Sequence, residues 1–456
     1  MRKVRYAIIG AGTVGLTALS IIKKQTDDYL LIQSGEFGTT CARVGCMPSK
    51  ALIHAANHFY HAQHANAVGV LGGTGLSVDQ ALVMQRVRRF RDRFTSGIKQ
   101  ATTDGLSSRH LLLGKAKFVA VNRLDVDGEL VEAERIIIGT GSSPIVPSAW
   151  RDSLGDRLLT SDNLFELEVL PKRIAVIGLG VIGLELGQSL SRLGVEVIGF
   201  EASDRLGGLR YAKSSEKLLQ LLSEEFPIYL DKSVDIEADA HSVRVVRGAE
   251  TFEVDAVLVT IGRKPNLADL NLACLGIDLN DQESLLVNPN TLQLESMPVF
   301  LAGDASGYRP ILHEAGDEGK IAALNALAYP DVRPKKRKTA LGISFIEPGV
   351  AYFGDRLDQL NPKLHVVADF DLHCNNGRAI VMDQDQGLIT VFADKQSGRL
   401  LGGELIMPQA EHLAHLLAWC VEQELTVARI LDMPFYHPVL EEAVESVLKR
   451  LKDKLQ

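Results

Sequence analysis

The chain carries the same six-residue pattern twice, and this repeat limits its possible folds more than any other feature. Residues 10–15 (GAGTVG) and residues 178–183 (GLGVIG) both have the form G-x-G-x-x-G. Each pattern follows an apolar stretch typical of a strand and opens a stretch typical of a helix, and a second apolar stretch comes later. The predicted strand, helix and strand are residues 4–9, 14–24 and 29–33 in the first copy and 173–177, 181–193 and 195–201 in the second. Two such units predict two doubly wound α/β domains.

Each glycine of the pattern has its own physical task. The first permits a tight turn, the second allows a pyrophosphate to approach the backbone, and the third allows the helix to pack on the strand. The positive end of the helix then attracts the phosphates. We therefore predict that dinucleotides bind at Gly10, Gly12 and Gly15 and at Gly178, Gly180 and Gly183. The alternative, an ordinary strand-to-helix turn, is disfavoured because both copies share the same flanking elements and spacing.

The residue 23 positions after the first glycine is expected to meet the adenosine ribose, and it is Gln33 in the first copy and Glu201 in the second. A carboxylate accepts hydrogen bonds from the ribose hydroxyls and repels an additional phosphate, so Glu201 favours NAD over NADP. NADP stays an alternative because Arg205 follows closely. The amide of Gln33 also fits a ribose, although this side chain has a solvent-facing alternative.

Two cysteines, Cys41 and Cys46, lie between the two glycine loops with four residues between them, and a helix is predicted at residues 51–64. A helix start and a nearby cation both favour the thiolate, the nucleophilic form of cysteine. Metal binding is the alternative, but no second cysteine pair exists, and the isolated Cys274, Cys374 and Cys420 are predicted to be structural. Redox use of the pair is therefore favoured.

Four histidines, His54, His58, His61 and His64, share one face of the predicted helix. Imidazoles at this spacing suit a metal ion, but a polar surface stripe is the more common explanation. We predict no metal site.

The chain has 456 residues, enough for two to four domains, and its hydrophobic (46%) and charged (23%) fractions are ordinary for a globular protein. Its net charge of -8 argues against nucleic acid as the main partner. No apolar stretch reaches the ~20 residues of a membrane helix. Five cysteines fit a reducing compartment, so a cytoplasmic location is predicted. The basic run at residues 335–338 is interpreted as a solvated linker.

These motifs together resemble the pyridine nucleotide-disulfide oxidoreductases over nearly the whole chain. Further similar segments are residues 139–142 (GTGS), 260–266 (TIGRKPN), 300–304 (FLAGD) and 437–442 (HPVLEE). The resemblance implies two Rossmann-like nucleotide-binding domains and an α+β C-terminal dimerisation domain. The implied boundaries are residues 1–143 with 264–339 for FAD, 144–263 for NAD, and 340–456 for the interface. An apolar stripe at helical spacing, Leu440, Val444, Val447, Leu448, Leu451 and Leu455, favours a partner surface, with docking inside the chain as the alternative.

The resemblance also implies roles for individual residues. Cys46 would contact the flavin and Cys41 would meet the substrate, with His437 as the base and Glu442 as the carboxylate that orients it. Lys50 and Glu185 would form a charged pair beside the flavin, and the active site would be completed across a homodimer. The remaining residues expected to contact the cofactors are Thr40, Gly141, Gly262 and Asp304.

The substrate is where the sequence departs from its closest resemblance, the dihydrolipoamide dehydrogenases. Gln33, Thr39, Arg43 and Val439 differ from their pattern, and Arg43 would bring a guanidinium near the cysteines. We predict a dihydrolipoamide dehydrogenase-like enzyme that passes electrons between NAD(H) and a dithiol or disulfide. The alternatives are an NAD(P)H-dependent reductase of another disulfide, a metal ion or a quinone, and a non-catalytic flavin-bearing subunit.

Overall fold

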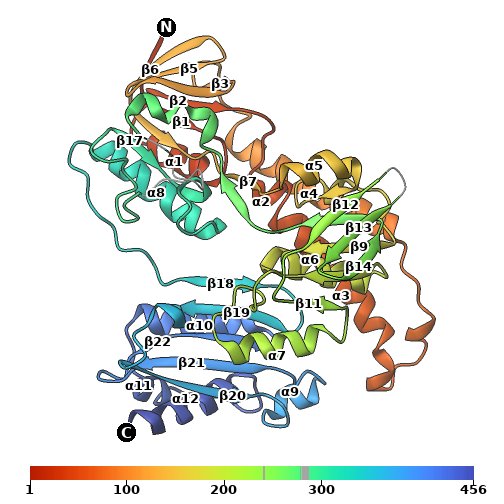
Figure 1. The fold of residues 1–456 in the computed structure, drawn as a ribbon. Helices are drawn as coiled ribbons and strands as arrows, with labels where there is room; N and C mark the ends of the chain where they lie inside the picture. Colours follow the sequence, from red (N-terminus) through yellow and green to blue (C-terminus); the bar gives the residue numbers. More distant parts are fainter. Residues whose placement is uncertain (240–241, 278, 280–286) are drawn as a thin grey trace.

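The computed structural model describes residues 1–239, 242–277, 279 and 287–456. Figure 1 shows one α/β unit beside the N-terminus, a second α/β unit beside it, and an antiparallel sheet near the C-terminus. The predicted fold class, two doubly wound units with a C-terminal α+β unit, is confirmed. No helix in the described part of the chain is long and apolar enough to cross a membrane.

The first unit is built on a seven-stranded sheet in which β1 lies between β2 and β6. These neighbours run parallel to β1, and β17, from much later in the chain, runs parallel to β6. Helix α1 packs on α8. The bounds are β1 Arg2–Ile9, α1 Thr13–Ile22, β2 Tyr29–Gln33, β3 Leu111–Leu113, β4 Ala116–Ala120, β5 Arg123–Val126, β6 Glu129–Ile138, β17 Val299–Leu301 and α8 Leu312–Ala328.

The second unit has a parallel sheet in the order β11-β10-β9-β15-β8, with a three-stranded antiparallel sheet, β12-β13-β14, beside it. The bounds are α5 Ser148–Leu154, β8 Leu158–Leu159, β9 Arg173–Ile177, α6 Val181–Arg192, β10 Glu196–Phe200, α7 Ala212–Leu222, β11 Ile228–Tyr229, β12 Asp235–Ala238, β13 Val243–Arg247, β14 Glu250–Val254 and β15 Ala256–Val259. A two-stranded ribbon of β7 (Ser142–Pro144) and β16 (Arg263–Pro265) carries the chain between the units. The exact domain boundaries stay a prediction.

The C-terminal unit is an antiparallel sheet in the order β18-β19-β22-β21-β20 with helices packed on it. The bounds are β18 Leu341–Ser344, β19 Gly349–Gly354, β20 His365–Asp371, α9 Gly377–Val381, β21 Leu388–Asp394, β22 Leu400–Met407, α10 Ala410–Glu422, α11 Val427–Leu431 and α12 Glu441–Leu455. The apolar stripe of α12 packs on β20 and β21 of its own chain. The stripe is therefore core, and its interpretation as a partner surface is wrong.

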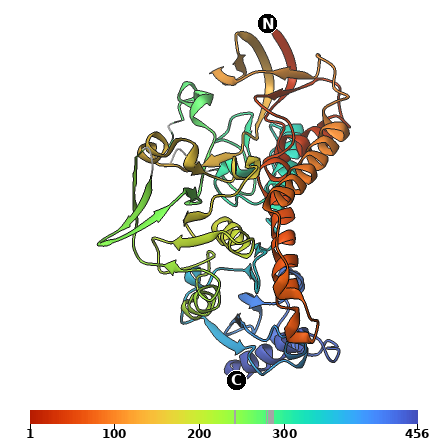
Figure 2. The ribbon, with the colours of Figure 1, turned by 90° about the vertical axis from the view of Figure 1, so that its right-hand side faces the viewer.

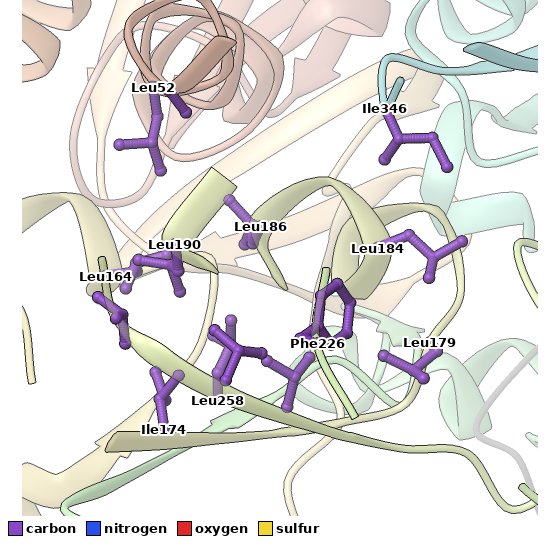
Figure 3. Packing of buried hydrophobic residues seen from close by; sticks show 14 of the residues in the cluster. Leu52, Leu164, Ile174, Leu179, Leu184, Leu186, Leu190, Phe226, Leu258 and Ile346 are labelled. Atoms are coloured by element: carbon purple, nitrogen blue, oxygen red, sulfur yellow. The ribbon is translucent and has the colours of Figure 1, made fainter. Parts of the chain in front are cut away.

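Helix α3 (Cys46–Gln63) packs against both α4 (Gln80–Thr102) and α6. Figure 2 shows α3 and α4 forming a column along one side of the molecule. Leu52 of α3 and Ile346 of the C-terminal unit belong to the same apolar core as Leu186 and Leu190 of the second unit (Figure 3). The helix that carries Cys46 is therefore held by a core shared with the second and C-terminal units.

The basic run at residues 335–338 lies in the segment without helix or strand between α8 and β18, and Lys335, Lys336 and Lys338 are exposed, as a solvated linker predicts, whereas Arg337 is not. Arg337 has a side chain only 7% exposed and forms ion pairs with Glu314 at 2.5 Å and Glu318 at 2.7 Å. Lys338 pairs with Asp317 at 2.8 Å. The carboxylates lie on one helix, α8, which the sequence places well before the basic run, so their pairing was not visible in the run itself.

Candidate active site

The two glycine loops have the same packing geometry. Gly10 and Gly178 have φ of 101° and 92°, a region that disfavours side chains. A Cβ on Gly15 or Gly183 would lie 1.8 or 2.0 Å from the carbonyl oxygen of the first glycine in its loop, so the third position must be glycine.

The middle glycines are not required by packing within the chain. A Cβ on Gly12 would have no neighbour closer than 3.9 Å, and one on Gly180 none within 4 Å among the described atoms. Open space beside the first turn of a helix fits the close approach of a pyrophosphate. The loops therefore fit the phosphates of two dinucleotides.

Gln33, at the end of β2, and Glu201, just after β10, each accept a hydrogen bond from a backbone amide of the glycine loop in their own unit. The Gln33 Oε1 accepts a hydrogen bond of 2.6 Å from the amide of Ala11, and the Glu201 Oε2 accepts one of 2.8 Å from the amide of Leu179. Both side chains thus reach back to their glycine loop. Gln33 is half-buried rather than turned to solvent.

A cavity of about 360 Å³ opens at the first glycine loop. Five of the residues predicted to contact cofactor line it: Gly10, Gly12, Gln33, Thr40 and Gly141. Asp304 is held next to this region because its Oδ2 accepts a 2.7 Å hydrogen bond from Ser142, a cavity-lining residue. Gly262 directly precedes β16 of the crossing ribbon, and its carbonyl accepts a hydrogen bond of 3.0 Å from the Ile145 amide. Polar backbone around a glycine loop fits the FAD that the sequence predicts.

Cys41 lies in the short helix α2 (Thr40–Arg43), and Cys46 is the first residue of α3. The helix thus begins five residues earlier than the predicted Ala51, because Pro48 falls in the first turn, where proline costs no helical hydrogen bond. Both cysteines are half-buried and carry free thiols.

The two thiols are hydrogen-bonded to each other and have opposite acidities. The hydrogen bond from Cys41 and the nearby charge of Lys50 lower the pKa of Cys46 to about 7, against the opposing effect of burial. The same hydrogen bond, together with burial, raises the pKa of Cys41. The start of α3 adds a partial positive charge at Cys46. In the reduced pair the thiolate therefore belongs to Cys46 and the proton to Cys41.

Lys50 lies one turn after Cys46 and forms an ion pair of 2.7 Å with Glu185 of α6. The Glu185 side chain is only 4% exposed, and its other oxygen accepts a 2.9 Å hydrogen bond from the amide of Phe345. The Lys50 ammonium also lies 4.7 Å from the centre of the Phe345 ring. A buried carboxylate with partners on both oxygens holds the cation in place. Sequence reasoning missed Phe345, which only the tertiary fold brings to Lys50.

Arg43 does not supply the cation of the cysteine pair. It forms an ion pair of 2.6 Å with Glu36 and lines the cavity at the first glycine loop. The cation that acts on Cys46 is Lys50. Arg43 lies between the two cysteines in the sequence, but in α2 the Arg43 side chain points toward Glu36.

His437 and Glu442 form the predicted pair, with 2.9 Å between Nδ1 and Oε1. The imidazole lowers the pKa of the Glu442 carboxyl, whose Oε2 also accepts a hydrogen bond from Val439. The ring of His437 is 79% exposed, and no hydrogen bond within the described chain joins it to either cysteine. Sequence reasoning missed Asn376, a 2% exposed residue that donates a 3.2 Å hydrogen bond to the Val439 carbonyl.

The four-histidine face is exposed, as the surface interpretation predicts. His54 and His58 stack on each other, and His61 pairs with Glu347 at 2.9 Å. Within the described residues these histidines form no group of three close metal ligands.

Two dinucleotide loops, a neighbouring cysteine pair with one acidic thiol, and a histidine–carboxylate pair define a class of protein: an oxidoreductase that joins nucleotide and thiol chemistry. The chain belongs to the pyridine nucleotide-disulphide oxidoreductase family, whose sequence profile matches residues 4–319. The dimerisation domain of the same family matches residues 342–448 and implies a homodimer. Members of this family bind FAD and a pyridine nucleotide.

Relatives match over most of their length. A dihydrolipoyl dehydrogenase of Halobacterium salinarum is 30% identical, with 96% of this chain and 94% of the relative covered. A mercuric reductase of Lysinibacillus sphaericus is 29% identical, with 93% of this chain and 78% of the relative covered.

Solved structures share the fold. LpdA from Mycobacterium tuberculosis has a TM-score of 0.83 at 23% identity, covering 98% of this chain and 100% of that one. The Cu(II) complex of the flavoprotein disulfide reductase RclA from Escherichia coli has a TM-score of 0.84 at 22% identity, covering 99% of this chain and 100% of that one.

Proposed function

We propose that this protein is a dihydrolipoamide dehydrogenase-like enzyme that moves two electrons between a dithiol substrate and NAD through Cys41 and Cys46. The observation that carries the proposal is the placement of the pair: Cys46 begins α3 one turn before the Lys50–Glu185 ion pair, whereas Cys41 lies in the preceding short helix, and this divides the thiols in acidity, with the thiolate at Cys46. A pair divided in this way has one sulfur suited to leave and one suited to exchange with a substrate.

The proposed cycle begins with a disulfide between Cys41 and Cys46. A substrate thiolate, whose proton passes to His437, attacks the Cys41 sulfur and breaks the bond to Cys46. Cys46 leaves as a thiolate, which its pKa of about 7 favours because a sulfur of lower pKa leaves faster. The second substrate thiol then closes the substrate disulfide, and Cys41 recovers a proton through His437. Glu442 keeps the His437 ring oriented during both transfers.

FAD, when bound, supplies the two-electron chemistry that links this dithiol to the nicotinamide. In the balanced reaction, the dithiol and NAD+ give the disulfide, NADH and one proton. Lys50, fixed by Glu185, places a positive charge beside the sulfur that gains electron density.

The preference for NAD is supported by the charges at the second glycine loop. Glu201 is anchored at the end of β10 through the amides of Leu179 and Ser203, so its carboxylate stays where the ribose is expected. Arg205 pairs with Asp204 at 2.8 Å, which reduces its value as a partner for an additional phosphate.

The test is an anaerobic titration of the holoenzyme with NADH. We expect a long-wavelength charge-transfer absorption in the wild type and in Cys41→Ser, and its loss in Cys46→Ser. Absence of the band in the wild type would favour the non-catalytic flavin-bearing subunit. Its persistence in Cys46→Ser would reject the assignment of the two sulfurs.

Steady-state rates with lipoamide, glutathione disulfide, quinones and Cu(II) then identify the substrate. The similarity to mercuric reductases is nearly as high as that to dihydrolipoyl dehydrogenases. Rapid turnover of another acceptor without turnover of lipoamide would replace the proposed substrate by that acceptor.

A further inference from the structure

The C-terminal unit contains a second group of potential ligands that the proposed reaction does not use. His373 and Cys374 lie between β20 and α9, and Asp385 lies shortly before β21. One ligand atom from each residue lies within 4.8 Å of the other two. Among the described residues, this is the one group of three that brings together nitrogen, sulfur and oxygen donors in this way.

The distance between the nitrogen and sulfur donors matches the separation of two ligand atoms that bind the same metal ion. His373 Nε2 and Cys374 Sγ lie 3.4 Å apart. Ligands at the usual Zn–N and Zn–S distances of about 2.0 and 2.3 Å in a tetrahedral site would be separated by about 3.5 Å. The two atoms therefore need almost no movement to hold one ion.

The Nδ1 side of the His373 ring also has polar partners. His373 Nδ1 lies 3.1 Å from Asp385 Oδ2 and 2.8 Å from Gln386 Nε2. The ring is free to bind a metal through Nε2 in the tautomer that donates from Nδ1 to Asp385, in which the Gln386 amide presents its oxygen to Nδ1 or turns away. The same Asp385 oxygen accepts a 3.0 Å hydrogen bond from the Cys374 amide, which ties both ligand residues to one carboxylate. A carboxylate on the second ring nitrogen fixes the orientation of a metal-binding histidine and increases its basicity. Asp385 thus orients the His373 ring so that Nε2 faces the Cys374 sulfur.

We propose that this group binds a divalent cation of the zinc type. His373 Nε2 and Cys374 Sγ are its direct ligands, Asp385 orients the imidazole, and water fills the remaining positions. Imidazole with thiolate favours zinc over magnesium or calcium, which prefer oxygen ligands. Cys374 gives up its thiol proton when the ion binds. The sequence predicted that Cys374 is structural. In the structure Cys374 is exposed, so its sulfur is accessible in the single protomer.

The proposal is tested with Zn2+ on the oxidised full-length holoenzyme, in which the Cys41–Cys46 disulfide offers no thiolate. We expect calorimetry to show one Zn2+ per chain in the wild type and none in Cys374→Ser or His373→Gln. Asp385→Asn should weaken binding about 10–100-fold. Cys274→Ser removes another exposed cysteine and serves as the matched control, with binding unchanged.

A second measurement follows the sulfur itself. The rate of alkylation of each cysteine, read by mass spectrometry, should fall at least about tenfold at Cys374 when Zn2+ is present and stay unchanged at Cys274. Equal rates with and without Zn2+, or full Zn2+ uptake by Cys374→Ser, would overturn the proposal. Neither measurement involves turnover, so its outcome is separate from that of the proposed oxidoreductase function.

Discussion

At the scale of single residues, the different positions of Cys41 and Cys46 give their thiols different acidities. Cys41 and Cys46 are both half-buried, yet only Cys46 begins a helix and lies one turn before Lys50. The hydrogen bond between the thiols then assigns the proton to Cys41. Such an environment distinguishes a reactive cysteine from an inert one.

The charge of Lys50 is expected to control the pH at which Cys46 ionises. The pKa of Cys46 is lowered to about 7, so its thiolate fraction rises as pH increases through this value. Lys50→Met removes the attractive charge and should move the midpoint up by about one pH unit. The measurement is the ultraviolet thiolate absorbance of the reduced protein, with the signal of Cys46→Ser subtracted.

Glu185 requires a control in this experiment, because its buried carboxylate raises the pKa of Cys46 and so opposes the effect of Lys50. The double variant Lys50→Met/Glu185→Gln removes both charges, and Lys50→Arg keeps the cation. A midpoint that stays near pH 7 in Lys50→Met would contradict the role given to Lys50, and the difference between this variant and the double variant measures the effect of Glu185.

Glu201 is expected to select the nucleotide. Glu201→Gln keeps an acceptor for the Leu179 amide, as Gln33 does for Ala11, but it removes the negative charge. Loss of a charged hydrogen bond of about 1.4 kcal/mol should raise KM for NADH about tenfold, while KM for NADPH falls. Steady-state kinetics with both nucleotides measure this change, and an unaltered preference would remove Glu201 from the ribose site.

At the scale of elements, the sequence predicted best where a local pattern decides the structure. The strand at residues 173–177 has the predicted bounds, and the paired helices and strands of both glycine loops differ by a few residues at most. The start of α3 was misplaced because Pro48 and the cysteine segment do not show helical periodicity.

Most of the errors share a physical cause, which is contact between distant segments. Phe345 covers Lys50, and α8 pairs with Arg337. Glu36 lies only seven residues from Arg43, but their pairing depends on the turn of the chain before α2. None of these partners is visible in the periodicity or composition around the residue itself. The resemblance to a known family supplied the residues of the candidate site, whereas their hydrogen bonds required the structure.

The α12 stripe allows a test of whether an element is core or interface. Leu448 is fully buried in its own chain. Leu448→Ala should reduce the free energy of unfolding by about 2–5 kcal/mol, because the cavity left behind adds to the lost burial. Chemical denaturation measures the loss, and sedimentation of the folded variant should still show a dimer. Dissociation without loss of stability would instead place the stripe at the subunit interface.

At the scale of the whole molecule, the position of His437 bears on the proposal of a shared site. The ring is exposed in the single chain, and its described hydrogen bond is to Glu442. His437 lies within residues 342–448, the part of the chain that matches the family's dimerisation domain. We propose that His437 serves the cysteine pair of the partner subunit.

Mixed dimers test this proposal. Cys46→Ser and His437→Ala homodimers should each be inactive, but a dimer with one subunit of each kind would contain one intact site if the site is shared. Random mixing of subunits should then recover about a quarter of the wild-type activity. No recovery after verified subunit exchange would place both groups of an active site on one chain.

The ion pairs of Arg337 also have a mechanical consequence. Arg337 is fastened to Glu318, and Glu318 accepts a 2.5 Å hydrogen bond from the amide of Gly303, next to Asp304. These two contacts join the segment that precedes the C-terminal sheet to the Asp304 loop, next to the cavity at the first glycine loop. We therefore expect a displacement of the C-terminal sheet to move this loop.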